Sequence, residues 1–381
     1  MIYLDSAATT LQKPPAVARA VSAAMGSMAS PGRGGHRPAM LAAKTAFACR
    51  ETAARLFHVS DPERVVFTFN ATHALNIAIK SLVRPGDTVL ISGFEHNAVT
   101  RPLAALEGVT VKVAAAPLFD PEAMAAAFRE QMTPEVSCVI CTHVSNVFGY
   151  VLPIAHIAAL CRERKVPLIL DASQSAGCLP VHMEELGAAF IAMPGHKGLY
   201  GPQGTGLLLC GDCESVPLLE GGTGSLSQSP SMPEFLPDRL EAGTHNIPGI
   251  AGLLEGLRFV ERTGTETIFR HELGLCRRAA QQLAALPGVR VFAGGAGESQ
   301  GGVLSFVVEG MDCEELGAAL GERGIAVRSG LHCAPLAHRT AATLESGTVR
   351  ASFSAFNTPR EADALARAVR GISSGKGLRS N

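Results

Sequence analysis

The feature that most constrains the fold is a set of short segments that are apolar on both of their faces. In VPLIL (166–170) and SCVIC (137–141), apolar residues mostly occupy successive positions instead of alternating with polar ones. Strands with this pattern are typical of parallel sheets, because helices cover both faces of such a sheet. Segments with helical periodicity separate the strands. This alternation predicts an α/β fold with a mostly parallel sheet flanked by helices.

The expected elements divide the chain into two parts. The first part is predicted to hold strands 65–69, 88–92, 109–113, 136–142, 167–170, 190–193 and 206–210, with helices such as 72–82, 121–131 and 154–164 between them. After about residue 250, the prediction is helices 250–263, 266–286, 313–323 and 359–371, strands 289–292, 302–308, 326–328 and 348–353, and a frayed tail, 373–381. We therefore expect a large domain formed by residues 15–250 and a smaller α+β domain formed by residues 1–14 and 251–381.

Composition argues against several classes of function. Of the 381 residues, 47% are hydrophobic and 18% are charged, which is typical of a globular chain. The net charge of −1, the lack of Trp and the three Tyr residues give no support to a nucleic-acid partner. The start, MIYLDSAATT, does not have the pattern of a signal peptide, and no run of about 18 apolar residues predicts a membrane span. A cytoplasmic enzyme is the resulting expectation.

The ten cysteines are expected to be reduced thiols, most of them buried as small apolar side chains. Two C-x-x-C spacings, Cys138/Cys141 and Cys210/Cys213, raise the alternative of a zinc ribbon. The first pair lies within a predicted strand, where positions i and i+3 point to opposite faces. We therefore expect no metal site.

Polar residues follow several predicted strands at the points where ligands bind to open α/β sheets. Asn70, Ala71 and Thr72 open the helix after the first strand, where free N–H groups favour a phosphate. His96 follows the second strand along the chain. An ordinary helix cap and an ordinary turn histidine are the alternatives.

Two further strands end in residues that carry charge. Asp171 ends a fully apolar strand, where a carboxylate needs a partner such as a cationic ring nitrogen or a capped loop. Lys197 follows the next strand within PGHKGLYGPQGTG. It is either a solvated charge or an amine for Schiff-base chemistry, which requires a pKa below about 10.4.

A third group of candidates lies far downstream. Cys333 follows His332 in RSGLHCAPL, near Arg328, and positive neighbours favour a reactive thiolate. His332 is one candidate for that positive neighbour. Arg350, in GTVRASF, is a plausible anchor for a substrate carboxylate.

In their order and in their residues, these blocks resemble those of the cysteine desulfurases of the class V aminotransferase superfamily, which are fold type I pyridoxal-phosphate enzymes. The resemblance extends nearly from end to end. It rests on the blocks YLDSAATT, FTFNATHALN, EHNA, HVSNVFG, DASQSAG, GHKGLYGPQGTG, LEAGTHN, RSGLHCA and VRASFSAFNT. The form of RSGLHCA is more similar to the group II, Suf-like branch than to the branch with a long mobile cysteine loop.

The resemblance implies a role for each cofactor residue. Lys197 would hold pyridoxal 5'-phosphate as a Schiff base and move protons at the substrate α-carbon. Asp171 would pair with the pyridinium nitrogen, His96 would stack on the ring, and Gln174 would bind the phenolic oxygen. The phosphate would be held by Ala71, Thr72, His196 and, from the partner subunit of a homodimer, Thr244.

The resemblance also implies a substrate and a product. Asn146 and Arg350, with Arg328 nearby, would hold L-cysteine, and the Cys333 thiolate would attack its sulfur. L-Alanine would leave and Cys333 would keep a persulfide for a sulfur-acceptor protein. L-Selenocysteine is an alternative substrate, because the same residues would handle both.

Three features depart from the better-studied relatives. Pro194 stands where many relatives carry a phosphate-binding serine, and Ala71 replaces a common hydroxyl residue. The segment GGTGSLSQSPSMPEFLPDRLEAGT (221–244), which contains Gly221–Ser225, is also unlike theirs. These changes bear on cofactor affinity and substrate choice, and not on the fold.

Alternative functions remain within and outside this superfamily. Selenocysteine lyase, cystine or cysteine-sulfoxide β-lyase and aminotransferase are the enzyme alternatives, and a β-eliminating lyase would not need Cys333. A non-catalytic scaffold is disfavoured because Lys197, Asp171, His96 and Cys333 are all present. A dinucleotide-binding enzyme is disfavoured because no G-x-G-x-x-G opens a helix after the first strands.

Overall fold

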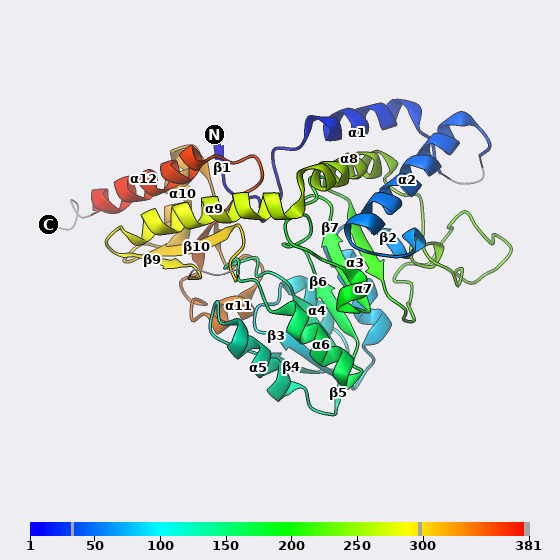
Figure 1. Ribbon diagram of the computed structural model, residues 1–381, viewed down its shortest axis with the longest axis horizontal. Helices are drawn as coiled ribbons and strands as arrows, with labels where there is room; N and C mark the ends of the chain where they lie inside the picture. Colours follow the sequence, from blue (N-terminus) through cyan, green and yellow to red (C-terminus); the bar gives the residue numbers. More distant parts are fainter. Residues whose placement is uncertain (32–33, 296–298, 377–381) are drawn as a thin grey trace.

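The computed structural model describes residues 1–31, 34–295 and 299–376. Its two main sheets lie apart, with the seven-stranded sheet on one side and the four-stranded sheet on the other (Figure 1). Helix α9 (Thr265–Ala284) follows α8 (Ile247–Thr263) and leads from the first sheet to the second. The predicted α/β architecture is confirmed.

The larger sheet is mostly parallel, as predicted. Its strands are β2 (Val65–Thr68), β3 (Thr88–Ser92), β4 (Thr110–Ala114), β5 (Val136–Thr142), β6 (Leu168–Asp171), β7 (Phe190–Pro194) and β8 (Gly206–Cys210). Their spatial order is β2-β8-β7-β6-β5-β3-β4. Strand β8 is antiparallel to both of its neighbours, and the other adjacent pairs are parallel. The carboxyl ends of β3, β5, β6 and β7 therefore meet at one edge.

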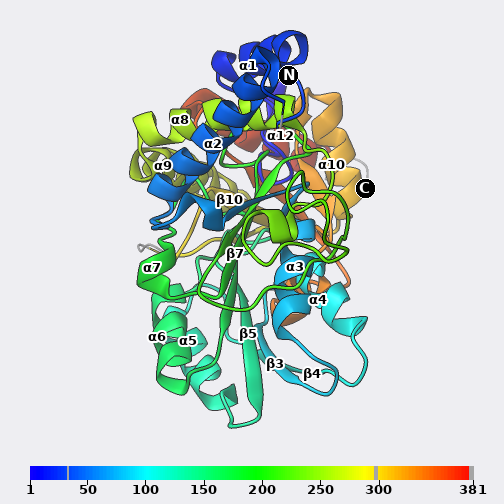
Figure 2. The ribbon, with the colours of Figure 1, turned by 90° about the vertical axis from the view of Figure 1, so that its right-hand side faces the viewer.

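Helices cover both faces of this sheet, which explains its doubly apolar strands (Figure 2). One face packs on α3 (Ala71–Leu82) and α4 (Asn97–Ala104). The other packs on α2 (Arg37–Leu56), α5 (Pro121–Gln131), α6 (Ile154–Arg164), α7 (Met183–Leu186) and α8. Cys138 and Cys141 belong to these two different cores, so they do not point to a common metal.

The smaller sheet is antiparallel, in the order β12-β13-β10-β9. It consists of β9 (Val289–Phe292), β10 (Val303–Val308), β12 (Arg328–Gly330) and β13 (Thr348–Ser352). Residues of α9, α10 (Cys313–Glu322) and α12 (Pro359–Lys376) form its core. The turn after β12 leads into α11 (Pro335–Thr340).

The predicted single strand at 326–328 is wrong. The segment forms two strands, β11 (Ile325–Ala326) and β12, which belong to different sheets. Strand β11 pairs in parallel with β1 (Ile2–Tyr3), a partner more than 300 residues away. This pairing supports the proposed assignment of residues 1–14 to the smaller domain.

The chain ends differ from the prediction in two ways. Helix α12 continues through Lys376, past the expected end at 371, so residues 373–376 are helical and not frayed. The rest of the predicted tail, 377–381, lies outside the described residues. Near the other end, α1 (Pro15–Ser27) was not singled out in the sequence. In the ranges that the structure describes, none of the helices is long and apolar enough to cross a lipid bilayer.

Candidate active site

A pocket at the carboxyl ends of β5, β6 and β7 brings together most of the predicted cofactor residues. It is lined by Asn70, Ala71, Thr72, His96, Ala98, Thr142, Val144, Asn146, Asp171, Ser173, Gln174, Pro194, His196 and Lys197. The predicted positions after successive parallel strands place these side chains at one sheet edge, and the structure brings them together there.

The start of α3 forms one end of this pocket. The Asn70 side chain accepts a hydrogen bond from the His73 N–H at 2.9 Å and caps the helix. The capping interpretation is therefore correct, and it leaves the first-turn N–H groups of Ala71 and Thr72 at the pocket. Gly206 allows this placement, because a Cβ there would lie 2.8 Å from the Asn70 carbonyl carbon.

Asp171 is the last residue of β6, and Gln174 lies in the turn that follows it. Asp171 is 3% exposed, and its Oδ1 accepts a hydrogen bond from the Ser173 N–H at 2.9 Å. Gln174 donates to the Ala7 carbonyl at 3.1 Å, so its amide also holds the N-terminal segment. Both side chains reach the pocket.

Lys197 is fixed by the close approach of two backbone segments. A Cβ on Gly198 would lie 2.3 Å from the Ala176 carbonyl oxygen, and one on Gly177 would lie 2.1 Å from the Gly198 oxygen. The glycine after Lys197 therefore allows close contact with the turn that follows Asp171. Burial lowers the pKa of Lys197 to about 8, although Asp171 acts in the opposite direction.

Two histidines flank the lysine, and both are neutral at pH 7. His96 caps the N-terminus of α4, where its Nδ1 accepts a hydrogen bond from the Ala98 N–H at 3.0 Å. Burial lowers the pKa of His96 to about 4, despite the attraction of Asp171. Burial also lowers the pKa of His196 to about 4, and its buried Nδ1 has no hydrogen-bond partner among the described residues.

Hydrogen bonds hold the backbone carbonyls of both His332 and Cys333. Asn146 donates through its side chain to the His332 oxygen at 2.8 Å, and the Asn97 N–H donates to the Cys333 oxygen at 2.8 Å. His332 and Cys333 have φ values of 50° and 56°, a left-handed conformation that is costly for residues other than glycine. Cys333 is exposed, and its backbone is bonded to Asn97, the residue that follows His96 in the chain.

The positive neighbour of Cys333 is Arg328 and not His332. The Arg328 Nη2 lies 4.0 Å from the Cys333 Sγ. His332 is buried, and burial lowers its pKa to about 2, so it carries no charge at neutral pH. Its Nε2 is 3.1 Å from the Thr348 carbonyl oxygen. Of the two candidates, only Arg328 therefore places a positive charge beside the thiol.

Arg350 has a partner that the sequence analysis missed. It is 1% exposed and donates to the Asn146 carbonyl at 2.9 Å and to the Asp5 carboxylate at 2.8 Å. Its buried Nε has no hydrogen-bond partner within the described part of the chain. Asp5 belongs to YLDSAATT, the first of the blocks that carry the resemblance. Its place in that block was the only sequence feature that could have suggested a role for Asp5 at the site.

Thr244 does not line the pocket of its own chain and lies on an exposed loop between β8 and α8. A buried network anchors this loop. Arg50 of α2 makes two hydrogen bonds to Glu241, at 2.7 and 2.6 Å, and His245 lies 3.1 Å from the same carboxylate. No local pattern in the sequence indicates the Arg50–Glu241 pair.

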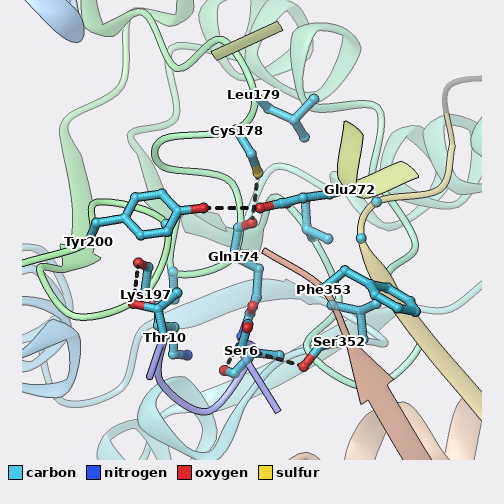
Figure 3. Close-up of a pocket in the computed structure, with 17 residues that line it drawn as sticks. Ser6, Thr10, Gln174, Cys178, Leu179, Lys197, Tyr200, Glu272, Ser352 and Phe353 are labelled. Carbon is cyan, nitrogen blue, oxygen red and sulfur yellow. Dashed lines mark hydrogen bonds between the residues drawn. The ribbon is translucent and has the colours of Figure 1, made fainter. Parts of the chain in front are cut away.

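A second cavity adjoins Lys197 on the side of α9 (Figure 3). Tyr200 and Glu272 point toward one another there, with the hydroxyl 3.4 Å from the carboxylate. Burial raises the pKa of Glu272 to about 8. The carboxyl group is therefore mostly protonated at neutral pH.

Comparison with known proteins agrees with this geometry. The profile of the aminotransferase class-V family matches residues 2–365. The chain belongs to this family. A probable cysteine desulfurase of Methanothermobacter thermautotrophicus is 33% identical, with 97% of this chain and 94% of the relative aligned. The structure of a cysteine desulfurase from Thermococcus onnurineus superimposes with a TM-score of 0.89 at 29% identity, covering 98% of this chain and 95% of the other.

Other class-V relatives are longer than this chain. A probable cysteine desulfurase of Mycolicibacterium paratuberculosis is 36% identical over 98% of this chain but only 56% of its own length. One from Mycobacterium leprae, also 36% identical, is covered over 62% of its length. The chain thus spans somewhat more than half of the length of these two relatives.

Enzymes of the class-V family depend on pyridoxal 5'-phosphate, and the pocket fits this group. The first turn of α3 and the unpartnered His196 Nδ1 suit a phosphate. The buried carboxylate of Asp171 suits a protonated ring nitrogen, and the lowered pKa of Lys197 suits an amine that bonds to an aldehyde. Pro194 lines the pocket without an N–H or hydroxyl group, so the phosphate depends on the other donors.

Proposed function

We propose that this protein is a cysteine desulfurase, which removes sulfur from L-cysteine to give L-alanine and a persulfide on Cys333. The observation that carries the proposal is the placement of an exposed thiol next to a buried lysine pocket. Cys333 is exposed, its carbonyl is held by Asn97, and the Arg328 guanidinium lies 4.0 Å from its sulfur. Cationic neighbours favour the thiolate, which is the nucleophilic form.

Each pocket residue would have a separate role toward the cofactor. Pyridoxal 5'-phosphate, when bound, supplies an electron sink for charge that develops at the substrate α-carbon. Asp171 would keep the ring nitrogen protonated, and neutral His96 would cover the ring. Lys197 would hold the cofactor and, with a pKa of about 8, accept and return protons near neutral pH. Ala71, Thr72, Gln174 and His196 would fix the position of the cofactor.

Arg350 and Asn146 support recognition of a small amino acid. Arg350 is buried beside the pocket, and its unpartnered Nε offers one further N–H for a carboxylate. Asp5 already accepts from Nη2, so it orients the guanidinium before substrate arrives. We propose that the substrate carboxylate binds at this position.

The sulfur transfer balances in atoms and electrons. The Cys333 thiolate attacks the sulfur of bound L-cysteine, so a sulfur–sulfur bond forms as the carbon–sulfur bond breaks. Both electrons of the broken bond stay with the substrate carbon, which takes a proton and leaves as L-alanine. The substrate carbon is reduced, and the two sulfur atoms are oxidised to a persulfide.

Several finer points belong to the proposal. A homodimer is expected, with Thr244 reaching the phosphate site of the partner subunit, and the exposed position of Thr244 supports this arrangement. A group II, Suf-like character, a cytoplasmic location and a sulfur-acceptor protein are proposed on the same basis. The ten cysteines are free thiols in the structure, which fits a reducing compartment.

Product analysis tests the proposal. The purified, cofactor-loaded protein and its Cys333→Ala variant are incubated with L-cysteine, and alanine, pyruvate and protein-bound sulfane sulfur are measured. Alanine with persulfide in the wild type, and neither in the variant, is the expected result. Pyruvate and sulfide from both proteins would contradict it and identify a β-eliminating lyase, in which Cys333 has no role.

A further inference from the structure

A cluster of possible metal ligands lies on the surface, away from the pocket of Lys197. It consists of His58, just after α2, with His182 and Glu185 at α7. One ligand atom from each residue lies within 4.8 Å of the other two. None of the three lines either cavity beside Lys197.

We propose that these three residues bind a divalent transition-metal ion of the zinc type. The Nδ1 atoms of His58 and His182 lie 3.6 and 2.8 Å from the Glu185 Oε1. Tetrahedral zinc with bonds of about 2.0–2.1 Å separates its ligand atoms by about 3.3 Å. The two observed distances lie on either side of that value.

The ligand set selects among cations. Two imidazole nitrogens and one carboxylate oxygen suit zinc and its first-row neighbours, whereas calcium and magnesium prefer oxygen ligands alone. Three protein ligands leave the fourth position to water, because the side chains are open to solvent at 50%, 27% and 68% exposure for His58, His182 and Glu185.

The backbone already holds the two ligand segments together. The Met183 N–H donates to the Phe57 carbonyl at 2.9 Å, which links the residues next to His58 and His182. Arg162 donates to the Glu185 and Leu186 carbonyls at 2.9 and 2.8 Å and fixes the end of α7. A metal ion would therefore cross-link α2 to α7 with little additional ordering.

One rearrangement is required. The rings of His58 and His182 are stacked, with centroids 3.7 Å apart and planes inclined by only 6°. Parallel rings direct their Nδ1 lone pairs side by side, so each ring must tilt toward the ion. The exposure of both side chains permits this tilt. His58 itself has a left-handed φ of 50°, which turns the chain toward α7 after the helix ends.

Zinc titration of the full, cofactor-loaded chain tests the site. A Cys333→Ser background removes the exposed thiol, which would otherwise bind zinc. Isothermal titration then compares this background with added His182→Ala, added His58→Ala and the matched control His156→Ala, which removes an exposed histidine elsewhere. Circular dichroism and the cofactor absorbance verify that each variant is folded.

We expect one zinc ion per chain in the background and in the His156→Ala control. His58→Ala and His182→Ala should weaken binding by more than the 10- to 100-fold that loss of a residue merely hydrogen-bonded to a metal ligand typically costs. Zinc should also raise the thermal midpoint of the control and not that of the two ligand variants. Equal zinc affinity in all four proteins, or no zinc binding by the background, would overturn the proposal. Neither result depends on desulfurase activity.

Discussion

Replacing Arg50 with alanine should destabilise the protein far more than replacing its neighbour Arg55. Arg50 and Glu241 are 9% and 7% exposed, and the guanidinium binds both carboxylate oxygens. The Phe67 N–H donates to the same carboxylate at 2.6 Å, and the guanidinium also lies 4.1 Å from the centre of the Phe67 ring. Removal of Arg50 leaves Glu241 buried without its main cation.

The expected magnitude follows from this burial. Loss of one partner from a buried ion pair costs about 3–5 kcal/mol, because the remaining charge has neither water nor a counter-ion. Arg55 lies on the same helix and pairs with Glu261 at 3.1 Å, but these side chains are 58% and 40% exposed. Such a pair contributes about 0–1 kcal/mol. Arg55→Ala is therefore the matched control for loss of an arginine from α2.

Urea unfolding at pH 7, followed by far-ultraviolet circular dichroism, measures both free-energy changes. Burial alone would raise the pKa of Glu241, but Arg50 and His245 outweigh burial and lower it. A lowered carboxyl pKa stabilises the folded state above the unfolded value of about 4.5, and this contribution is lost as the pH falls below it. The gap between wild type and Arg50→Ala should thus narrow in acid. Equal losses for Arg50→Ala and Arg55→Ala would refute this reasoning.

Three further changes test the pocket and its surroundings. Lys197→Ala should abolish the absorbance of lysine-bound pyridoxal 5'-phosphate, and an unchanged spectrum would remove Lys197 from the site. Arg350→Ala should raise KM for L-cysteine by roughly 10- to 150-fold, which corresponds to a charged hydrogen bond of about 1.5–3 kcal/mol, and an unchanged KM would exclude this role. Burial raises the pKa of Glu272 from 4.5 to about 8, so the unfolded chain ionises first and wild-type stability should fall as the pH rises from 4.5 to 8, by at most roughly 4–5 kcal/mol. Glu272→Gln should remove that part of the fall, and identical pH profiles of unfolding for variant and wild type would contradict the raised pKa.

The local sequence pattern was sufficient to predict most of the central sheet and the helices that pack on it. Strands 88–92, 136–142 and 206–210 and helices 121–131 and 154–164 have the predicted bounds. In these segments, burial on both faces or on one helical stripe acts in the same direction as local propensity. The polar residues at the strand ends were predictable for a related reason, since parallel strands bring their carboxyl ends to one edge.

Contacts between distant segments could not be predicted from local sequence patterns. Strand β11 exists because β1 pairs with it, and no periodicity within 325–330 indicates that partner. The Asp5–Arg350 and Arg50–Glu241 pairs join residues 345 and 191 positions apart. Adjacency in sequence was also misleading for His332, whose ring is buried next to Thr348 while the sulfur of Cys333 is exposed next to Arg328.

The candidate site lies where the two sheets are joined, and this position constrains the sulfur chemistry. Asn146 binds the His332 carbonyl, Arg350 binds the Asn146 carbonyl, and the Asn97 N–H binds the Cys333 carbonyl. The thiol therefore belongs to a segment that is fixed to the loops of the larger sheet and cannot move outward without breaking these bonds. Since the Cys333 side chain is nevertheless exposed, a sulfur acceptor would have to approach the protein surface at Cys333 itself. On the proposed function, Asn146→Ala should slow persulfide formation and leave cofactor absorbance intact, because it frees the His332 carbonyl and not Lys197.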